Sequence, residues 1–306
     1  MRKVLDLGYG NPAVLQKELI PLTIIAEPEK APYFFAKNPI DSLKKTIYKL
    51  HSEHGNVSIQ DKSQIVITVG AVQAIQACLY FYSKKGFKKV YIPKPFWGRF
   101  KDFTDLLGFE IVDKPSEDSI SLITSPNNPN GASQAHLKAD IRDACYNWTH
   151  YTDRVEKFND RFVLFSLSKL SGHSSSRIGW VVCQSVEDSR IVQDFVNIFT
   201  SGVSIEAQMI ATKAIETIPN MIFSKWKKAI QTRKDLLNMI ILTKSLPMKT
   251  ESSDGMFWYG TADIDFIRSL DIIFVEGADS FDPQSGKVRL NLAVSDEVWE
   301  EFISRL

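Results

Sequence analysis

The sequence predicts an α/β protein with a mainly parallel sheet sandwiched by helices, followed by a smaller α+β region. Short apolar runs rich in β-branched residues alternate with helical patterns between residues 65 and 182. This alternation is typical of a parallel sheet that is buried on both faces. After about residue 200 two long helical patterns precede isolated strand-like runs, so the regular alternation ends there.

The first elements are read from their periodicity and end signals. A helix is expected over 41–53, where Leu43, Ile47 and Leu50 recur at helical spacing. A strand is expected over 65–69, and Gly70 should end it before a helix over 72–82. Further strands are predicted over 90–92, 121–124, 162–167 and 179–182, with a helix over 100–107.

The C-terminal part predicts helices over 204–218 and 222–242, and strands over 256–259 and 288–292. We therefore predict an N-terminal arm over 1–35 that joins the small domain, a large domain over 36–203 and a small C-terminal domain over 204–306. No repeat and no Gly/Ser-rich linker separates these parts, which favours interleaved domains.

Composition limits the classes of function. The 306 residues include 37 Lys and Arg against 36 Asp and Glu, a net charge of +1. So balanced a chain has no field that attracts nucleic acid or a membrane surface, and we expect neither as a partner. The N-terminus lacks a signal-peptide pattern, and Cys78, Cys145 and Cys183 have no disulfide or zinc spacing. We expect a cytoplasmic protein with reduced thiols and no metal site.

The most informative segment, SLSKLSGHSSSRIGW, covers residues 166–180. Lys169 directly follows a predicted strand, and ligands of parallel sheets bind beyond the carboxyl ends of the strands. A partly desolvated lysine there has a lowered pKa and can attack a carbonyl group. Arg177 offers a forked charge for a phosphate, and Ser166 a hydroxyl. A lone lysine in a loop is usually solvated, so the joint spacing carries the inference.

This segment resembles the Schiff-base lysine motif of fold-type I pyridoxal-phosphate (PLP) enzymes, and within them that of the alliinase and plant tryptophan aminotransferase branch. The resemblance implies the fold-type I transferase fold, with a seven-stranded-type sheet. It also implies pyridoxal 5'-phosphate as the cofactor, Lys169 as the amine that binds it covalently, and a large domain that holds it.

Two further runs resemble the same branch. In SPNNPNG, residues 125–131, the resemblance gives Asn128 a hydrogen bond to the phenolic oxygen of the cofactor. In DACYNWTHYT, residues 143–152, it assigns Asp143 to the pyridine nitrogen and Tyr146 to the phenolic oxygen. A carboxylate there keeps the ring protonated and thus an electron sink. Trp148 and Tyr151 of this run are equally consistent with packing.

Residues 69–73 stand between a strand and a helix, where first-turn amides can bind a phosphate. This assigns Gly70, Ala71 and Val72 to the phosphate, although the family usually has a hydroxyl residue here, so binding would depend more on Ser166 and Arg177. The run PKPFWG, residues 93–98, resembles the loop whose aromatic residue stacks on the pyridine ring. We assign this role to Trp97, with Phe96 as the competing residue.

The substrate side is predicted from the two ends of the chain. VRLNL, residues 288–292, resembles the strand whose arginine binds the substrate α-carboxylate, which assigns Arg289. Asn11 lies in a segment similar to the branch's substrate loop, with asparagine in place of the family's acid. Tyr33 is predicted to reach the phosphate of a neighbouring subunit, because the family is built as homodimers.

These residues predict an aminotransferase that converts an L-amino acid, aromatic and similar to L-tryptophan, and a 2-oxo acid into the corresponding oxo acid and amino acid. Lys169 is its general base. A carbon–sulfur lyase acting by β-elimination would use the same residues, and a non-catalytic PLP-fold binding protein is a third reading. A nicotinamide dehydrogenase is disfavoured because no GxGxxG follows a strand. Trp97 and residues 257–259 would line an aromatic pocket, and core packing is an equally good explanation for residues 257–259.

Overall fold

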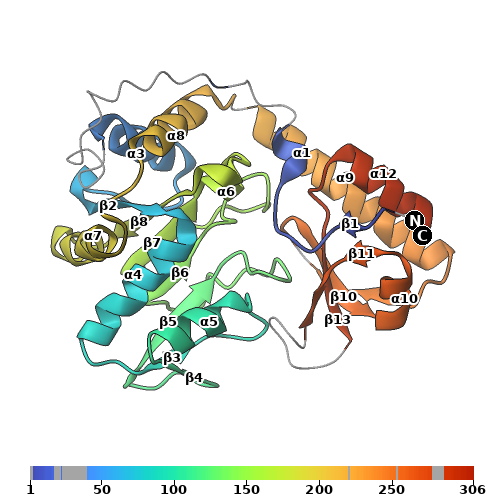
Figure 1. Cartoon of the computed structure of the whole chain (residues 1–306), viewed down its shortest axis with the longest axis horizontal. Helices are drawn as coiled ribbons and strands as arrows, with labels where there is room; N and C mark the ends of the chain where they lie inside the picture. The colour runs from blue at the N-terminus through green and yellow to red at the C-terminus, as the bar shows by residue number, and fades with distance from the viewer. Residues whose placement is uncertain (1–2, 17–21, 23–39, 220, 253, 278–285) are drawn as a thin grey trace.

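The computed structural model describes residues 3–16, 22, 40–219, 221–252, 254–277 and 286–306. Figure 1 shows two sheets side by side, a large one with its helices and a small one, with both chain termini beside the small sheet. Tyr33 and the other residues outside these ranges are not part of the description.

The large sheet has seven strands in the order β2-β8-β7-β6-β5-β3-β4. Strand β8 is antiparallel to both neighbours, and the other pairings are parallel. The mainly parallel sheet is therefore confirmed. The strands are β2 (Ile65–Val69), β3 (Lys89–Tyr91), β4 (Glu110–Val112), β5 (Ser119–Thr124), β6 (Ile141–Asp143), β7 (Phe162–Ser166) and β8 (Ile178–Cys183).

Helices cover this sheet. They are α3 (Asp41–His54), α4 (Gly70–Lys84), α5 (Arg99–Leu106), α7 (Val186–Thr200) and α8 (Ile205–Thr217), whereas the long helix α9 (Ile222–Thr243) lies beside the small sheet (Figure 1). Helix α4 packs on β7 and β8, α7 packs on α4 and β2, and α3 packs on α8. Helix α4 begins at Gly70, two residues before its predicted start, with Gly70 at a φ of 68°. Glycine tolerates this conformation, so Gly70 opens the helix directly after the strand.

One predicted boundary matters for the site. Strand β7 ends at Ser166, and Leu167–Leu170 form the one-turn helix α6. The side chain of Ser166 accepts a hydrogen bond from the backbone N–H of Ser168 at 3.2 Å, which caps this turn. The predicted strand 162–167 was therefore one residue too long, and Lys169 lies in a helical turn beyond the carboxyl end of β7.

The small sheet is antiparallel, in the order β12-β13-β10-β9. The predicted strands 256–259 and 288–292 correspond to β10 and β13. Strand β1 pairs in parallel with β11, so the first residues of the chain join this part. Its elements are β9 (Met248–Thr250), β10 (Phe257–Ala262), α10 (Ile264–Ser269), β11 (Ile272–Ile273), β12 (Val275–Glu276), β13 (Lys287–Asn291) and α12 (Asp296–Arg305), with β1 (Leu5–Asp6) and α1 (Ala13–Gln16) from the N-terminus.

Two hydrophobic clusters hold these parts together. Helix α9 contributes to both, with Trp226 and Ile230 in the cluster of the large sheet and Leu237 and Ile241 in that of the small sheet. A continuous helix thus connects the two cores. The division into 1–35, 36–203 and 204–306 stays a prediction. All three cysteines are buried and free, and no helix in the described ranges is long and apolar enough to cross a bilayer.

Candidate active site

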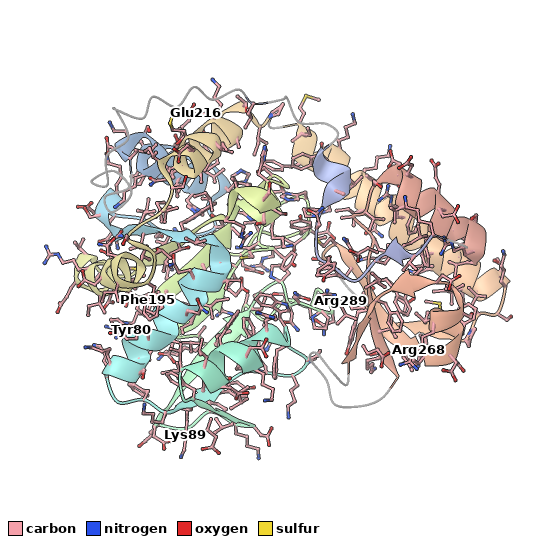
Figure 2. The ribbon with its side chains drawn as sticks, in the orientation of Figure 1. Tyr80, Lys89, Phe195, Glu216, Arg268 and Arg289 are labelled. Carbon is pink, nitrogen blue, oxygen red and sulfur yellow. The ribbon has the colours of Figure 1, made fainter. Side chains whose placement is uncertain are left out.

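A cavity of about 920 Å³ lies beyond the carboxyl ends of the parallel strands, and its lining residues come from both the large-sheet part and the small-sheet part. Figure 2 shows Arg289 in the middle of the molecule, between these two parts. The predicted residues that line the cavity are Asn11, Ala71, Val72, Trp97, Asn128, Asp143, Tyr146, Ser166, Lys169, Arg177 and Arg289. Gly70 does not line it but lies directly under Arg177.

Lys169 is the central amine of the cavity. Its Nζ donates a hydrogen bond to the carbonyl oxygen of Gly10 and lies 5.7 Å from the ring centre of Tyr146. Burial lowers the pKa of Lys169 from 10.5 to about 8, with Arg289 and Arg177 acting in the same direction. An amine with this pKa is partly neutral near physiological pH, as a nucleophile or general base requires.

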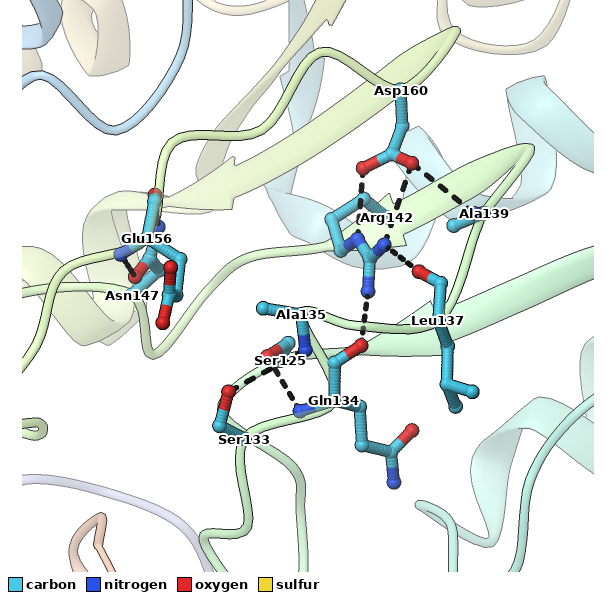
Figure 3. Close-up of polar contacts among 10 residues, drawn as sticks. All are labelled: Ser125, Ser133, Gln134, Ala135, Leu137, Ala139, Arg142, Asn147, Glu156 and Asp160. Carbon is cyan, nitrogen blue, oxygen red and sulfur yellow. Dashed lines mark hydrogen bonds and ion pairs between the residues drawn. The ribbon is translucent and has the colours of Figure 1, made fainter.

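Asp143 is the last residue of β6, and its neighbour Arg142 anchors the strand (Figure 3). Successive side chains of a strand point to opposite faces, so Arg142 points away from the cavity. Its Nε lies 2.9 Å from Oδ2 of Asp160, and it donates to the carbonyl oxygens of Gln134 and Leu137 at 3.1 and 2.6 Å. This buried network holds the short strand, and with it Asp143.

Asp143 is a buried carboxyl group. Its Oδ1 accepts a hydrogen bond from the backbone N–H of Cys145 at 3.1 Å. Burial raises the pKa of Asp143, while the bonds from Cys145 and the charge of Lys169 act against this rise. A cation placed beside the carboxylate would offset its desolvation.

Arg177 and the start of α4 form one wall of the cavity. Arg177 has a φ of 53°, and its Nη1 donates to the carbonyl oxygen of Ser174 at 2.6 Å and lies 3.5 Å from Oγ of Ser168. A Cβ on Gly70 would lie 2.3 Å from Nη2 of Arg177, so only glycine permits this approach. The guanidinium therefore faces the same space as the first turn of the helix, whose amides attract anions.

Arg289 stands on β13 and is almost fully buried. Its Nη2 donates to the carbonyl oxygen of Gly8 at 2.6 Å, and its Nη1 to Oδ1 of Asn128 at 2.8 Å. The guanidinium carbon lies 4.2 Å from the ring centre of Phe257, and burial lowers the pKa of Arg289 to about 10. Arg289 retains one buried donor, its Nε, without a hydrogen-bond partner among the described residues.

The segment around Gly8–Asn11 crosses the cavity. Asn291 fixes it, because its Nδ2 donates to the carbonyl oxygens of Tyr9 and Asn11, both at 2.8 Å. Asn11 also accepts a hydrogen bond from the Ser174 hydroxyl at 3.1 Å. The carbonyl oxygens of Gly8 and Gly10 thus accept hydrogen bonds from Arg289 and Lys169, respectively. These are the two cations that a substrate and a cofactor would engage.

The structure separates the aromatic residues that the sequence left ambiguous. Trp97 lines the cavity, whereas Phe96 is buried outside its lining. Residues 257–259 are also buried outside the lining. Core packing therefore accounts for these three, and of the two candidates for ring stacking Trp97 is the one that lines the cavity.

Several lining residues were not predicted. Ile273, Phe274 and Val275 form an apolar wall together with the exposed Tyr9. No motif marks them, because they reach the cavity only through the pairing of β1 with β11 and of β12 with β13. The other unpredicted side chains are those of Arg99, Asp102, Cys145, Ser168 and Ser174. Of these, Ser168 and Ser174 could have been found from the hydroxyl-rich run around Lys169.

This set of residues fits pyridoxal 5'-phosphate. Lys169, Arg177 and Arg289 outnumber Asp143, and the lining pair Arg99–Asp102 is internally balanced at 3.1 Å. The cavity therefore favours an anionic ligand. Arg177, held close to the first turn of α4, suits a phosphate, and the buried carboxyl group suits a protonated ring nitrogen. Among the described residues, no group of three or more His, Cys, Asp or Glu could hold a metal ion.

Comparison with known sequences supports this assignment. The family model described as allinase matches residues 22–236. Tryptophan aminotransferase-related protein 2 of Arabidopsis thaliana is 24% identical over 357 aligned positions, which cover 99% of this chain and 81% of that protein. Alliin lyase 2 of Allium sativum is 31% identical over 220 positions, 62% of this chain and 45% of the lyase. The chain thus spans less than half the length of that lyase.

Solved structures show the same fold. An aminotransferase from Staphylococcus aureus superposes with a TM-score of 0.80 at 17% identity, covering 99% of this chain and 93% of that one. A protein from Methanococcus jannaschii, described as similar in its active site to kynurenine aminotransferases, also gives a TM-score of 0.80, at 18% identity, over 99% of this chain and 91% of that one. The architecture is therefore that of fold-type I aminotransferases.

Proposed function

Because the chain belongs to the alliinase family, we propose that it is a PLP-dependent aminotransferase acting on an L-amino acid and a 2-oxo acid. The observation that carries this proposal is the convergence of Lys169, Asp143 and Arg289 on one cavity. These side chains come from α6, β6 and β13. They supply the amine, the acid and the carboxylate-binding cation that transamination needs.

Each wall of the cavity has a task in this proposal. Arg177, Ser166, Ser168 and the first-turn amides of α4 would hold the cofactor phosphate, and Trp97 would cover the ring. Asp143 would pair with the ring nitrogen. PLP, when bound, supplies an electrophilic carbon for amines and an electron sink for the bond cleaved at the substrate Cα.

Lys169 and Arg289 would act on the substrate. Arg289 would bind the α-carboxylate with its guanidinium, which requires the Gly8 carbonyl to leave. Nζ of Lys169, once neutral, takes the proton from the substrate Cα and returns a proton to complete the amino-group transfer. Tyr146 and Asn128 lie in the same lining and would contact the phenolic oxygen of the cofactor.

An aromatic substrate side chain is the proposal that best suits the lining. Trp97, Tyr9, Ile273 and Phe274 present apolar surface to the cavity, and apolar lining with few polar groups is typical of sites for such ligands. The name of the Arabidopsis relative points in the same direction, towards L-tryptophan.

A carbon–sulfur lyase is the second candidate, favoured by the 31% identity to alliin lyase 2 over 220 positions. The same residues would bind the substrate and remove its α-proton. A sulfur leaving group on the β-carbon would then depart with the bonding electron pair, and hydrolysis of the remaining fragment would give pyruvate and ammonia.

One absorption experiment separates these candidates. The full-length protein is loaded with PLP and mixed singly with L-tryptophan, other L-amino acids and S-alkyl cysteines, without a 2-oxo acid. Loss of the visible band with one equivalent of 2-oxo acid formed supports transamination. A persistent band with accumulating pyruvate and ammonia supports the lyase. If the protein shows no visible band, or if a Lys169→Ala variant turns over normally, both proposals are wrong.

We further propose a cytoplasmic homodimer with sites at the subunit interface, as the family resemblance implies. Light scattering on the purified protein tests the oligomeric state. A monomeric protein that is fully active would contradict a shared site. Neither a nucleic acid nor a membrane partner is part of this proposal.

A further inference from the structure

The backbone carbonyl of Lys169 receives two side-chain hydrogen bonds. Nε2 of His150 lies 2.9 Å from this oxygen, and the hydroxyl of Tyr151 donates to it at 3.0 Å. Both side chains are buried and come from consecutive residues in the loop after β6. The loop that follows Asp143 thus contacts the backbone of the reactive lysine.

The shortness of α6 explains why such donors are needed. The last four carbonyl groups of any α-helix lack a partner within the helix, and α6 has only four residues. Buried carbonyl groups require donors. His150 and Tyr151 therefore supply at Lys169 what the next turn of a longer helix would supply.

The imidazole of His150 is held in one state. A carbonyl oxygen can only accept, so Nε2 carries the proton. Burial lowers the pKa of His150 to about 3, so the ring is neutral. It stacks on Phe223 at 5.1 Å and 11° and meets the edge of Trp226 at 5.5 Å. Among the described residues, nothing bonds its Nδ1, so the bond to Lys169 is the polar contact that orients the ring.

Tyr151 is fixed from the other side. Its backbone carbonyl accepts a hydrogen bond from the N–H of Gly255 at 2.7 Å. The next residue, Thr152, donates from its hydroxyl to Oδ2 of Asp254 at 2.8 Å. The loop is therefore held by the turn that precedes β10 and presents Tyr151 to Lys169 from a fixed base.

We propose that His150 and Tyr151 are positioning residues that hold the one-turn helix α6 so that Nζ of Lys169 stays buried in the cavity. The inference rests on the proposed role of Lys169 as the reactive amine. Neither residue touches the reacting atoms. Both act through the backbone of Lys169, and loss of their bonds would let the turn relax and the amine reach water.

The test measures how Lys169 titrates in the full-length, cofactor-free protein. Reductive methylation with formaldehyde, and cyanoborohydride as the hydride donor, modifies the neutral amine, and mass spectrometry of the Lys169 peptide gives its rate at each pH. In the wild type the midpoint should lie near 8. In Tyr151→Phe it should rise by about 0.5 unit, and in Tyr151→Phe/His150→Phe by more than about one unit, towards the 10.5 of a free lysine. His150→Phe alone should also raise the midpoint. His150→Gln retains an N–H donor, so its midpoint should lie close to that of the wild type.

Tyr82→Phe is the matched control, because it removes a buried tyrosine hydroxyl that donates to Asp140 at 3.3 Å. It should leave the Lys169 midpoint unchanged. The proposal is overturned if Tyr151→Phe titrates like the wild type, or if Tyr82→Phe moves the midpoint equally. Should the double variant fail to fold, Tyr151→Phe alone decides. Because the titration needs neither PLP nor turnover, failure of the proposed function would leave this result intact.

Discussion

Replacing Lys169 by methionine should stabilise the cofactor-free protein at neutral pH, although it removes the amine that we propose to be reactive. Methionine has a similar length and shape but carries no charge. Burial lowers the pKa of Lys169 from 10.5 to about 8. Each pKa unit corresponds to about 1.4 kcal/mol, so the charged amine costs the folded state about 3 kcal/mol at pH 7 relative to the neutral amine.

The lost hydrogen bond to the Gly10 carbonyl reduces this gain. A buried hydrogen bond contributes about 1 kcal/mol, so Lys169→Met should be more stable than the wild type by about 2 kcal/mol at pH 7. Between the folded pKa of about 8 and the unfolded value of 10.5, the unfolded chain binds more protons. The wild type therefore gains stability as the pH rises, and the advantage of the variant should disappear near pH 10.

Urea unfolding followed by tryptophan fluorescence at pH 7 and pH 10 measures both quantities. The control is Lys138→Met, because Lys138 is exposed and such changes alter stability by about 0.5 kcal/mol or less. A Lys169→Met variant that is less stable than the wild type at pH 7, or whose advantage is the same at both pH values, would refute the reasoning.

Three further variants probe the surroundings of the amine. Arg289→Lys keeps the charge but loses the forked geometry, so the KM for the amino acid should rise by about 10- to 100-fold with a smaller change in kcat. An unchanged KM in steady-state kinetics would show that Arg289 does not bind the carboxylate. In Gly10→Ala the new Cβ would lie 3.2 Å from Nζ of Lys169 and 3.3 Å from Cζ of Phe257. A PLP titration followed in the visible range should therefore show several-fold weaker binding than in the wild type. Equal affinity would contradict the close contact of Gly10 with Lys169. Arg142→Met leaves the Asp160 carboxylate without its buried cation, which should lower the free energy of unfolding by about 3–5 kcal/mol. A urea midpoint like that of the wild type would show that the network in Figure 3 does not hold β6.

The parts of the site that the sequence predicted are those encoded within short stretches of chain. Ser166, Lys169 and Arg177 are separated by a few residues, and a strand followed by one turn and a second strand places them together. The strands over 65–69 and 179–182 were equally readable, because their apolar β-branched runs are bounded by glycine or a polar turn. Strand β6 was missed because two of its three residues, Arg142 and Asp143, are charged, so it shows no apolar run.

Other features depend on contacts between distant segments. The Gly8 and Gly10 carbonyls reach Arg289 and Lys169 only because β1 pairs with β11 and Asn291 holds the following loop. Tyr151 could be read as packing, and the structure shows that its hydroxyl also bonds the Lys169 carbonyl. Hydrogen bonds between segments so far apart leave no periodic signal in the sequence.

By itself the sequence determined the fold class, the lysine that faces the cavity and the acid and arginines that accompany it, since each follows from local pattern and motif. The tertiary structure decided which of the candidate stacking residues lines the cavity, which apolar side chains form its wall and which groups bond the backbone carbonyl of Lys169. The physical reason is that burial and hydrogen bonding depend on the neighbours a side chain acquires on folding, and these come from strand order and from the packing of the small sheet against the large one.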